Sequence, residues 1–421
     1  MIKVIKEKDF DIKKLRNSEE EERKLREVVK AIMDDVKERG DEALIEYTEK
    51  FDGHRPKALK VTEDERRQAE DSLDEEMKSV IRASAENIRN FHRCQIDEGF
   101  VIEEEGKIIG ERVLPIERVG IYVPGGTASY PSTVLMNGIP AKLAGCKKIV
   151  MVTPAGKNGK IADELLFAAN IAGIDEIYKI GGAQAIGALL YGTETVPNVY
   201  KVTGPGNRYV AEAKRQSFGR IDIDMIAGPS EILIIADENA NPVYIAADML
   251  SQAEHDKDAS SILVTTSKEL SDKVREEIEI QLKELDREII AAESIKNKGL
   301  IVIAETMDSS LDLANEIAPE HLELMVENPI DFLGKITNAG SVFMGEYSPE
   351  PLGDYFAGTN HTLPTSGTAK FASALSVDSF VKKSQFICYS REALIQSAEK
   401  IMAFAKREGL TAHGKSIEKR R

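Results

Sequence analysis

Residues 118–126 read RVGIYVPGG, a continuous apolar segment that runs directly into a proline and two glycines. A short apolar run bounded by turn residues is typical of a strand that is buried on both faces of a sheet. Similar segments recur along the chain, with stretches between them that are long enough for helices. They span residues 118–123, 148–153, 175–180, 199–203, 231–236, 261–265 and 300–304. This alternation predicts an α/β fold with mostly parallel sheets, in which ligands bind at the carboxyl ends of the strands.

The composition indicates an acidic globular chain. Its 421 residues are 42% apolar and 30% charged, and at roughly 150 residues per domain this length predicts two to three domains. Lys and Arg total 56 against 72 Asp and Glu, so the net charge of −16 opposes binding to nucleic acid or to an anionic membrane. No apolar run approaches the roughly 18 residues of a membrane span. Residues 1–8 lack the apolar stretch of a secretory signal, so we expect a cytoplasmic protein.

The chain differs in character on either side of the alternating region. Helical patterns dominate the first hundred residues: Ser18 and Glu21 form a capping-box signal before a helix that continues to Gly40, and a second helix begins at about Asp74. From about residue 345 the chain is rich in glycine and proline, and it ends in a helix at about 391–408 and a polar tail.

Three glycine-containing turns follow predicted strands, at residues 124–126, 181–182 and 204–207. Glycine allows the backbone to approach a ligand closely, and the helix that follows offers free N–H groups to a phosphate. Together the turns indicate a nucleotide site, although each one alone could be an ordinary tight turn. The dinucleotide fingerprint G-x-G-x-x-G is absent, because residues 204–209 read GPGNRY. Residues 409–416, GLTAHGKS, match the P-loop pattern but follow a helix, so we expect no P-loop there.

Four of the six histidines lie after residue 250. Asn241 and Pro242 mark the start of a helix that places Gln252 and His255 on one face. This spacing can hold a metal ion, but a histidine at a helix end is more often a cap or exposed, and glutamine is an unusual zinc ligand. The three cysteines are far apart in the sequence, so neither a disulfide framework nor a cysteine zinc site is indicated.

Two further groups of polar residues could carry chemistry. Pro319 reads as a helix start, after which Glu320 and His321 could serve as acid and base in different steps, or could be a dipole-complementing Glu beside an incidental His. Asp354 and His361 lie in the loop-rich stretch, where Asp354 could be a metal ligand or a turn former.

Nine short segments, in order over nearly the whole chain, together resemble the histidinol dehydrogenase family. They are YVPGG at 122–126, GGAQAI at 181–186, GPGN at 204–207, AGPSE at 227–231, SQAEH at 251–255, APEHL at 318–322, GDY at 353–355, GTNH at 358–361 and EGLTAH at 408–413. The resemblance implies a zinc-dependent, NAD-linked enzyme of histidine biosynthesis that oxidises L-histidinol to L-histidine through L-histidinaldehyde.

The resemblance also implies roles for individual residues, carried over at the matching positions. The zinc ligands are Gln252, His255, Asp354 and His413. Glu320 activates a water molecule and His321 acts as the base, while the NAD contacts are Tyr122, Gln184 and Asn207. Substrate contacts come from Ser230, Glu408 and His361, together with His321 and the four zinc ligands.

The expected architecture has two Rossmann-like domains with incomplete, mostly parallel sheets, a helical N-terminal segment and a small C-terminal tail domain. We place an N-terminal arm at 1–20, the zinc and catalytic domain at 21–120 and 231–375, the NAD-binding domain at 121–230 and a helical tail at 376–421. In the family the tail reaches a partner subunit of an intertwined homodimer, so Glu408 and His413 are expected to complete the neighbour's site.

Other functions remain open at this point. A paralogous enzyme could keep zinc and NAD and oxidise another small amino alcohol or polyol. A zinc hydrolase could use Glu320 to activate water but leaves the glycine turns without a purpose. A nucleotide-binding regulator without catalysis leaves the four candidate ligands unexplained.

Overall fold

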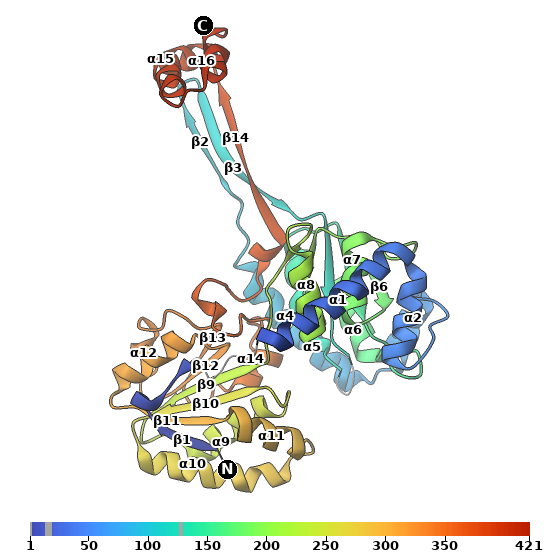
Figure 1. Ribbon diagram of the computed structural model, residues 1–421, viewed down its shortest axis with the longest axis vertical. Helices are drawn as coiled ribbons and strands as arrows, with labels where there is room; N and C mark the ends of the chain where they lie inside the picture. The colour runs from blue at the N-terminus through green and yellow to red at the C-terminus, as the bar shows by residue number, and fades with distance from the viewer. Residues whose placement is uncertain (1, 13–18, 126–128) are drawn as a thin grey trace.

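The computed structural model describes residues 2–12, 19–125 and 129–421. It contains two parallel sheets and one antiparallel group of strands (Figure 1), which confirms the predicted α/β class with two incomplete Rossmann-like sheets. All seven predicted strands are present, with ends within two residues of those expected. The capping-box residue Ser18 and the turn residue Gly126 lie outside the described residues. Among the described helices, none is both long and apolar enough to cross a membrane.

The first sheet has six parallel strands in the order β1-β11-β10-β9-β12-β13. Their bounds are β1 Lys3–Lys6, β9 Glu231–Ala236, β10 Ser260–Thr265, β11 Leu300–Ile303, β12 His321–Met325 and β13 Ser341–Met344. One face packs on α9 (Pro242–Ala253), α10 (Lys268–Gln281) and α11 (Glu288–Lys298), and the other on α12 (Met307–Ile317). Because both faces are covered, the inner strands β9 and β11 are apolar at nearly every position.

The second sheet has five parallel strands in the order β6-β5-β4-β7-β8. Their bounds are β4 Arg118–Tyr122, β5 Lys148–Thr153, β6 Glu176–Lys179, β7 Lys201–Thr203 and β8 Asp222–Ile223. On one face lie α4 (Glu75–Arg93), α5 (Pro131–Leu143) and α6 (Asp163–Ala172), and α3 (Glu63–Ser72) packs on α6. On the other face lie α1 (Glu19–Arg39), α2 (Asp41–Asp52), α7 (Gly182–Tyr191) and α8 (Arg208–Ser217).

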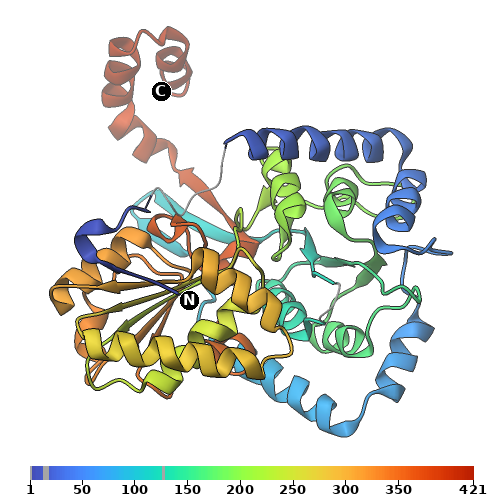
Figure 2. The ribbon, with the colours of Figure 1, turned by 60° about the horizontal axis from the view of Figure 1, so that its bottom comes forward.

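The packing of the N-terminal helices differs from the expected domain division. Residues 21–120 were expected to join 231–375, yet α1 packs on α7 and α8, and α4 packs on α5 and α6, all around the five-stranded sheet (Figure 2). The cause is apolar matching, since Val29 and Met33 of α1 and Ile81 and Ile88 of α4 are buried in the two cores of that sheet. Only the N-terminal strand β1 belongs to the six-stranded sheet.

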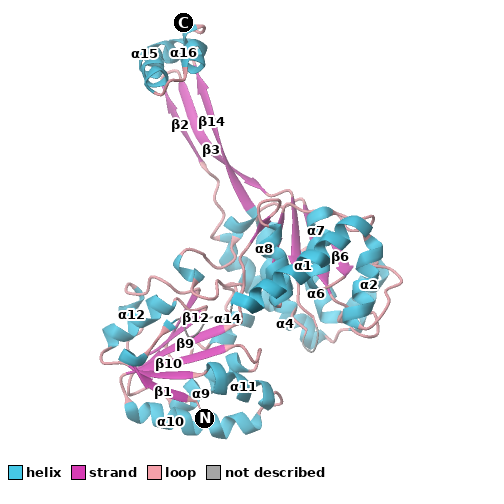
Figure 3. Ribbon diagram, in the orientation of Figure 1, coloured by secondary structure: helices cyan, strands magenta, loops and turns pink. Residues whose placement is uncertain are grey.

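An arm of three antiparallel strands projects from the body and carries the C-terminal helices at its tip (Figure 3). It consists of β2 (Phe100–Glu104), β3 (Lys107–Pro115) and β14 (Val381–Tyr389), followed by α15 (Arg391–Arg407) and α16 (Thr411–Glu418). The region 376–421 is therefore part strand, and the polar tail after residue 408 forms a helix. Two short helices complete the body, α13 (Ile330–Leu333) and α14 (Glu350–Tyr355).

Candidate active site

The candidate catalytic residues gather at the amino-terminal edge of the six-stranded sheet. Glu231 and His321 are the first residues of the parallel strands β9 and β12. Helix α9 runs back from the opposite edge, so its last turn places Ser251 and Gln252 here, where Ser251 Oγ donates to Glu350 Oε2 of α14 at 3.0 Å. These candidates therefore lie at the edge of this sheet opposite to the carboxyl ends of its strands, where ligands were expected.

His321 is buried and held in one orientation. Its Nδ1 lies 2.9 Å from the backbone oxygen of Glu231. A carbonyl oxygen only accepts, so Nδ1 carries the proton and donates, which leaves Nε2 as an acceptor. Nε2 is buried and has no hydrogen-bond partner within the described ranges. Burial lowers the pKa of His321, so the neutral imidazole presents a free lone pair to the site.

Glu320 is also buried, and it is oriented separately from its neighbour. Its Oε2 accepts from the backbone N–H of Glu231 at 2.9 Å and lies 3.7 Å from His321 Nδ1. Burial raises the pKa of Glu320 well above its usual value. The predicted helix start at Pro319 is wrong. Helix α12 ends at Ile317 and is capped by Ala318 with φ 54°; Glu320 lies in the connection that follows, and strand β12 begins at His321.

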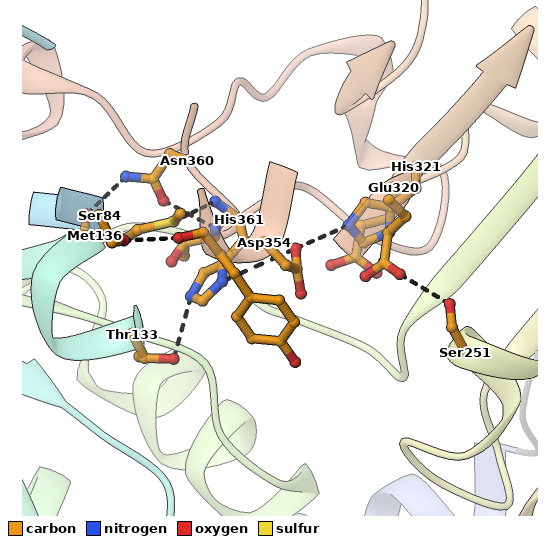
Figure 4. Close-up of polar contacts among 12 residues, drawn as sticks. Ser84, Thr133, Met136, Ser251, Glu320, His321, Asp354, Asn360 and His361 are labelled. Atoms are coloured by element: carbon orange, nitrogen blue, oxygen red, sulfur yellow. Dashed lines mark hydrogen bonds and ion pairs between the residues drawn. The ribbon is translucent and has the colours of Figure 1, made fainter. Parts of the chain in front are cut away.

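Asp354 lies at the centre of the group, between two histidines (Figure 4). Its Oδ1 is 3.9 Å from His321 Nε2 and 3.9 Å from His361 Nδ1. Together His321, Glu350 and Asp354 could hold a metal ion, since one potential ligand atom from each lies within 4.8 Å of the others. Burial raises the pKa of Asp354, and the charge of nearby Glu350 raises it further. A bound cation would relieve this repulsion between carboxylates.

Glu350 is a site residue that sequence reasoning missed. It is 2% exposed, and its backbone N–H donates to Glu323 Oε1 at 2.8 Å. The available signal was the i, i+4 spacing of Glu350 and Asp354, which places two carboxylates on one face of a helix. That signal was hidden by the prolines on either side of Glu350, which read as loop.

His361 connects the site to the five-stranded sheet. Its Nε2 lies 3.1 Å from Thr133 Oγ1 of α5, and its backbone N–H donates to Met136 Sδ at 3.1 Å. Burial lowers its pKa to about 4. The neighbouring Asn360 donates to the backbone oxygen of Met136 at 2.6 Å, so these three contacts fix the loop carrying His361 to α5.

Gln252 and His255 take different positions at the end of α9. Gln252 is 1% exposed, and its Oε1 has no hydrogen-bond partner among the described residues. An unpartnered buried amide oxygen is costly unless a ligand completes it. His255 follows the helix and is exposed, and its charge acts on both His321 and His361. The donor types of Gln252, His255 and Asp354 suit a metal ion, but the described group of ligand atoms within 4.8 Å of one another consists of His321, Glu350 and Asp354 and does not include His255.

The remaining substrate candidates are distributed between the site and the arm. Ser230 is half-buried immediately before β9, and its backbone oxygen accepts from Ser260 N–H at 2.9 Å. Glu408 and His413, in contrast, are exposed at the tip of the arm, at the end of α15 and within α16 (Figure 1). The structure does not bring these two residues to the site of their own chain.

The nucleotide candidates lie at the carboxyl edge of the five-stranded sheet. Tyr122 ends β4, is 4% exposed, and its hydroxyl oxygen accepts from the backbone N–H of Gly182 at 3.1 Å. A Cβ on Gly182 would meet Gln184 Oε1, so Gln184 folds over the same turn, and this oxygen has no partner within the described part of the chain. A Cβ on Gly206 would lie 3.2 Å from the Tyr122 ring, which places the third turn against the same side chain.

Asn207 has a structural role in this edge. Its side chain caps α8 by accepting from Tyr209 N–H at 3.0 Å and from Val210 N–H at 3.2 Å. The turn before it is anchored by Lys214, whose Nζ donates to the Gly204 oxygen at 2.9 Å and pairs with buried Asp224. The P-loop pattern at 409–416 spans the turn between α15 and α16, without a preceding strand.

Comparisons with known proteins agree with one another. A family model described as histidinol dehydrogenase matches residues 15–421. The histidinol dehydrogenase of Caldanaerobacter subterraneus is 54% identical over 100% of this chain and 98% of its own length. That of Clostridium acetobutylicum is 53% identical over 93% and 91%. A crystal structure of histidinol dehydrogenase from Elizabethkingia anophelis superposes with a TM-score of 0.93 at 40% identity, covering 100% of this chain and 98% of that one. The chain, an oxidoreductase, belongs to the histidinol dehydrogenase family.

Proposed function

We propose that the chain catalyses the zinc-dependent, NAD-linked, four-electron oxidation of L-histidinol to L-histidine through L-histidinaldehyde. The observation that carries the proposal is the free Nε2 of His321, held beside Asp354 and next to the buried carboxyl group of Glu320. This pair offers one base for the alcohol and one for water within a single buried site.

A zinc ion is proposed to bind Gln252, His255 and Asp354, with His413 of the partner subunit as the fourth ligand. The unpartnered Oε1 of Gln252 and the crowded carboxylate of Asp354 support this assignment. When bound, zinc supplies a redox-inert positive centre that holds and polarises substrate nitrogen and oxygen atoms. This ligand set leaves His321 Nε2 free to act as a base, whereas a metal ion held by His321, Glu350 and Asp354 would occupy it.

In the first oxidation His321 Nε2 accepts the hydroxyl proton of histidinol as the hydride leaves the adjacent carbon. The bond from Nδ1 to the Glu231 oxygen fixes the ring during this transfer and stabilises the positive charge that the ring acquires. His321 releases this proton to solvent before the second half, in which Glu320 takes a proton from the water that adds to the aldehyde and His321 accepts a proton from the resulting diol as the second hydride leaves.

NAD is proposed to bind at Tyr122, Gln184 and the turn that ends at Asn207, where it supplies the hydride acceptor for both oxidations. Two oxidations require two NAD molecules in succession. Because Asn207 already caps its own helix, and the G-x-G-x-x-G fingerprint is absent, the chain grips the dinucleotide loosely. A loose grip suits exchange of the cofactor while the aldehyde stays bound.

The active sites are proposed to be shared between the subunits of a homodimer. Glu408, as the partner of the substrate ammonium, and His413 lie on an arm that reaches away from its own body (Figure 1). Every residue of β2 is exposed, as are Ile387 at 77% and Phe404 at 73%. A second copy of the chain would cover these apolar side chains. A cytoplasmic location stays a prediction.

Formation of NADH from L-histidinol tests the proposal. We expect NADH absorbance with L-histidinol, its loss after chelation, and its return with zinc. No NADH with histidinol, but NADH with another amino alcohol, would instead support a paralogous dehydrogenase.

Zinc binding by two variants tests the ligand set. We expect His255→Ala to lose zinc by at least about tenfold in affinity, and Glu350→Gln, as the matched control, to retain it. Calorimetric titration measures the zinc affinity of each variant, and metal analysis measures its zinc content. The reverse pattern would move the ion to the group of His321, Glu350 and Asp354.

A further inference from the structure

We propose that Asp52 binds a ribose hydroxyl of the adenosine half of NAD, and that His54 forms the adjoining wall of the same subsite. The inference rests on the proposed function, because it requires NAD at the carboxyl edge of the five-stranded sheet. It adds residues 52–54, which belong to none of the glycine turns, to the proposed NAD site beside Tyr122.

Asp52 and His54 carry buried polar atoms that lack partners. Asp52 is the last residue of α2, and Gly53, with φ 76°, turns the chain sharply after it. Asp52 Oδ2 and both ring nitrogens of His54 are buried and form no hydrogen bond with any described residue. Buried polar groups are nearly always paired, so neighbouring unpaired acceptors and donors indicate a site that a ligand completes.

The backbone after His54 shows which edge of the sheet this segment occupies. Lys179 N–H donates to the Leu59 oxygen at 2.7 Å, and Val61 N–H donates to the Ile177 oxygen at 2.9 Å. The segment 59–61 therefore runs antiparallel to β6. Residues before 59 extend past the carboxyl end of β6, which is the edge where the turn at Gly181 begins.

Packing links His54 to the loops of the same edge. A Cβ on Gly159 would lie 3.4 Å from His54 Cδ2, so the ring covers the loop that follows β5. Pro154, at the start of this loop, lies so close to Gly125 and Gly181 that a Cβ on either would contact it at 2.6 or 2.8 Å. His54 therefore packs on a loop that also contacts two of the glycine turns.

The second observation that points to a ligand comes from Tyr122 and Gln184. Burial raises the pKa of Tyr122 to about 12, and the charge of Asp52 acts in the same direction. Gln184 is 1% exposed with an unpartnered Oε1 over the turn at Gly182, to which Tyr122 is bonded. On this basis we place Asp52 beside Tyr122 and Gln184, so that the three side chains flank one ligand.

The strand order assigns this position to the adenosine half. The catalytic group touches the five-stranded sheet through Thr133 and Met136 of α5, the helix that follows the central strand β4. Asp52 lies instead beyond β6, the edge strand, so the nicotinamide faces the catalytic group and the adenosine faces Asp52. In dinucleotide folds a carboxylate accepts from the ribose hydroxyls. Here α2 would supply that carboxylate from outside the sheet.

Binding of nucleotide fragments to the zinc-loaded protein, without histidinol, tests the proposal. NMR titrations with AMP, 2′,3′-dideoxy-AMP and nicotinamide mononucleotide are compared for wild type, Asp52→Ala, Asp52→Asn and His54→Ala. Glu49→Ala is the matched control, since Glu49 lies on the same helix, is exposed and pairs with Arg55.

We expect Asp52→Ala to weaken AMP by about tenfold, the worth of a hydrogen bond to a charged group. Binding of dideoxy-AMP and of nicotinamide mononucleotide should be unchanged. His54→Ala should weaken AMP, Asp52→Asn should lose less than Asp52→Ala, and Glu49→Ala should match wild type.

Unchanged AMP affinity in both Asp52 variants would overturn the proposal. An equal loss for AMP and dideoxy-AMP, or a loss confined to nicotinamide mononucleotide, would overturn it as well. If the wild type itself binds neither NAD nor these fragments, the proposed function fails. If the wild type binds them and the variants bind them equally well, only the proposal for Asp52 fails.

Discussion

Glu320 and His321 are neighbours in the sequence, yet each is oriented by a different atom of one residue. The Glu231 carbonyl oxygen fixes His321 Nδ1, and the Glu231 N–H fixes Glu320 Oε2. The two side chains stay close together, with 3.7 Å between Glu320 Oε2 and His321 Nδ1. The pairing of Glu231 with both residues follows from the register of β9 and β12 and cannot be read from either segment alone.

The chemistry of a residue type could be predicted from the sequence, but its surroundings could not. His321 and Asp354 were candidates because histidine and aspartate suit acid-base and metal chemistry, whereas Gln252, an unusual zinc ligand, was assigned through the family resemblance. Glu350 was missed because the prolines beside it read as loop, and because Ser251 and His321 reach it from other elements of the fold.

Cys146 provides a prediction at this scale. It is 4% exposed, and burial raises the pKa of its thiol to about 12. Since the thiolate is the reactive form, Cys146 should be inert near neutral pH. In the variant with Cys94→Ser and Cys388→Ser we expect no rapid reaction with an aromatic disulfide reagent before denaturation. Rapid modification of the native double variant would contradict the burial of Cys146.

At the scale of elements, strands buried on both faces were predictable and exposed strands were not. Segments such as 148–153 and 231–236 are apolar at nearly every position and form β5 and β9. The arm strands β2 and β14 are mostly exposed, β3 is mostly half-buried, and all three carry charged residues, so they lack this pattern. Strand β12 was taken for a helix start because a Pro-Glu pair is also common in first helical turns.

The turn at Gly204 provides a prediction for an element. Gly204 has φ 109°, and a Cβ there would overlap the Tyr122 backbone, whereas Gly219 has φ 97° with open space around it. We expect Gly219→Ala to cost about 1 kcal/mol in the free energy of unfolding, and Gly204→Ala at least about 2 kcal/mol more, because the overlap adds to the backbone strain. Gly204→Ala should also weaken NAD binding.

Urea unfolding and calorimetric titration with NAD measure the two effects of these substitutions. Equal stability losses in the two variants, with NAD affinity unchanged in both, would show that the close approach of this turn to Tyr122 does not matter.

At the scale of the whole molecule, the two parallel sheets were predicted from the sequence, and the antiparallel arm was not. Helices α1 to α4 close the five-stranded sheet, and β2, β3 and β14 carry α15 and α16 away from the body. The arm brings together segments near residues 100 and 385, and no local pattern announces a pairing over that separation. We propose shared active sites because the arm exposes apolar residues and holds His413 far from the site of its own chain.

Hybrid dimers test the sharing of sites. His321→Ala and His413→Ala should each be nearly inactive as homodimers. When the two are unfolded together and refolded at equal amounts, about half of the dimers are hybrid, and one of the two sites in each hybrid has both residues intact. We therefore expect recovery of about a quarter of wild-type activity. No recovery, although hybrids form, would show that His413 serves its own chain.

The most direct test of the central claim is the number of NADH molecules formed for each L-histidinol consumed. Two successive hydride transfers in one site predict about two NADH per histidine produced by the wild type. With Glu320→Gln we expect the ratio to fall towards one, because the aldehyde is no longer hydrated efficiently while His321 still accepts the first proton. A wild-type ratio of one, with the aldehyde as the final product, would contradict the account.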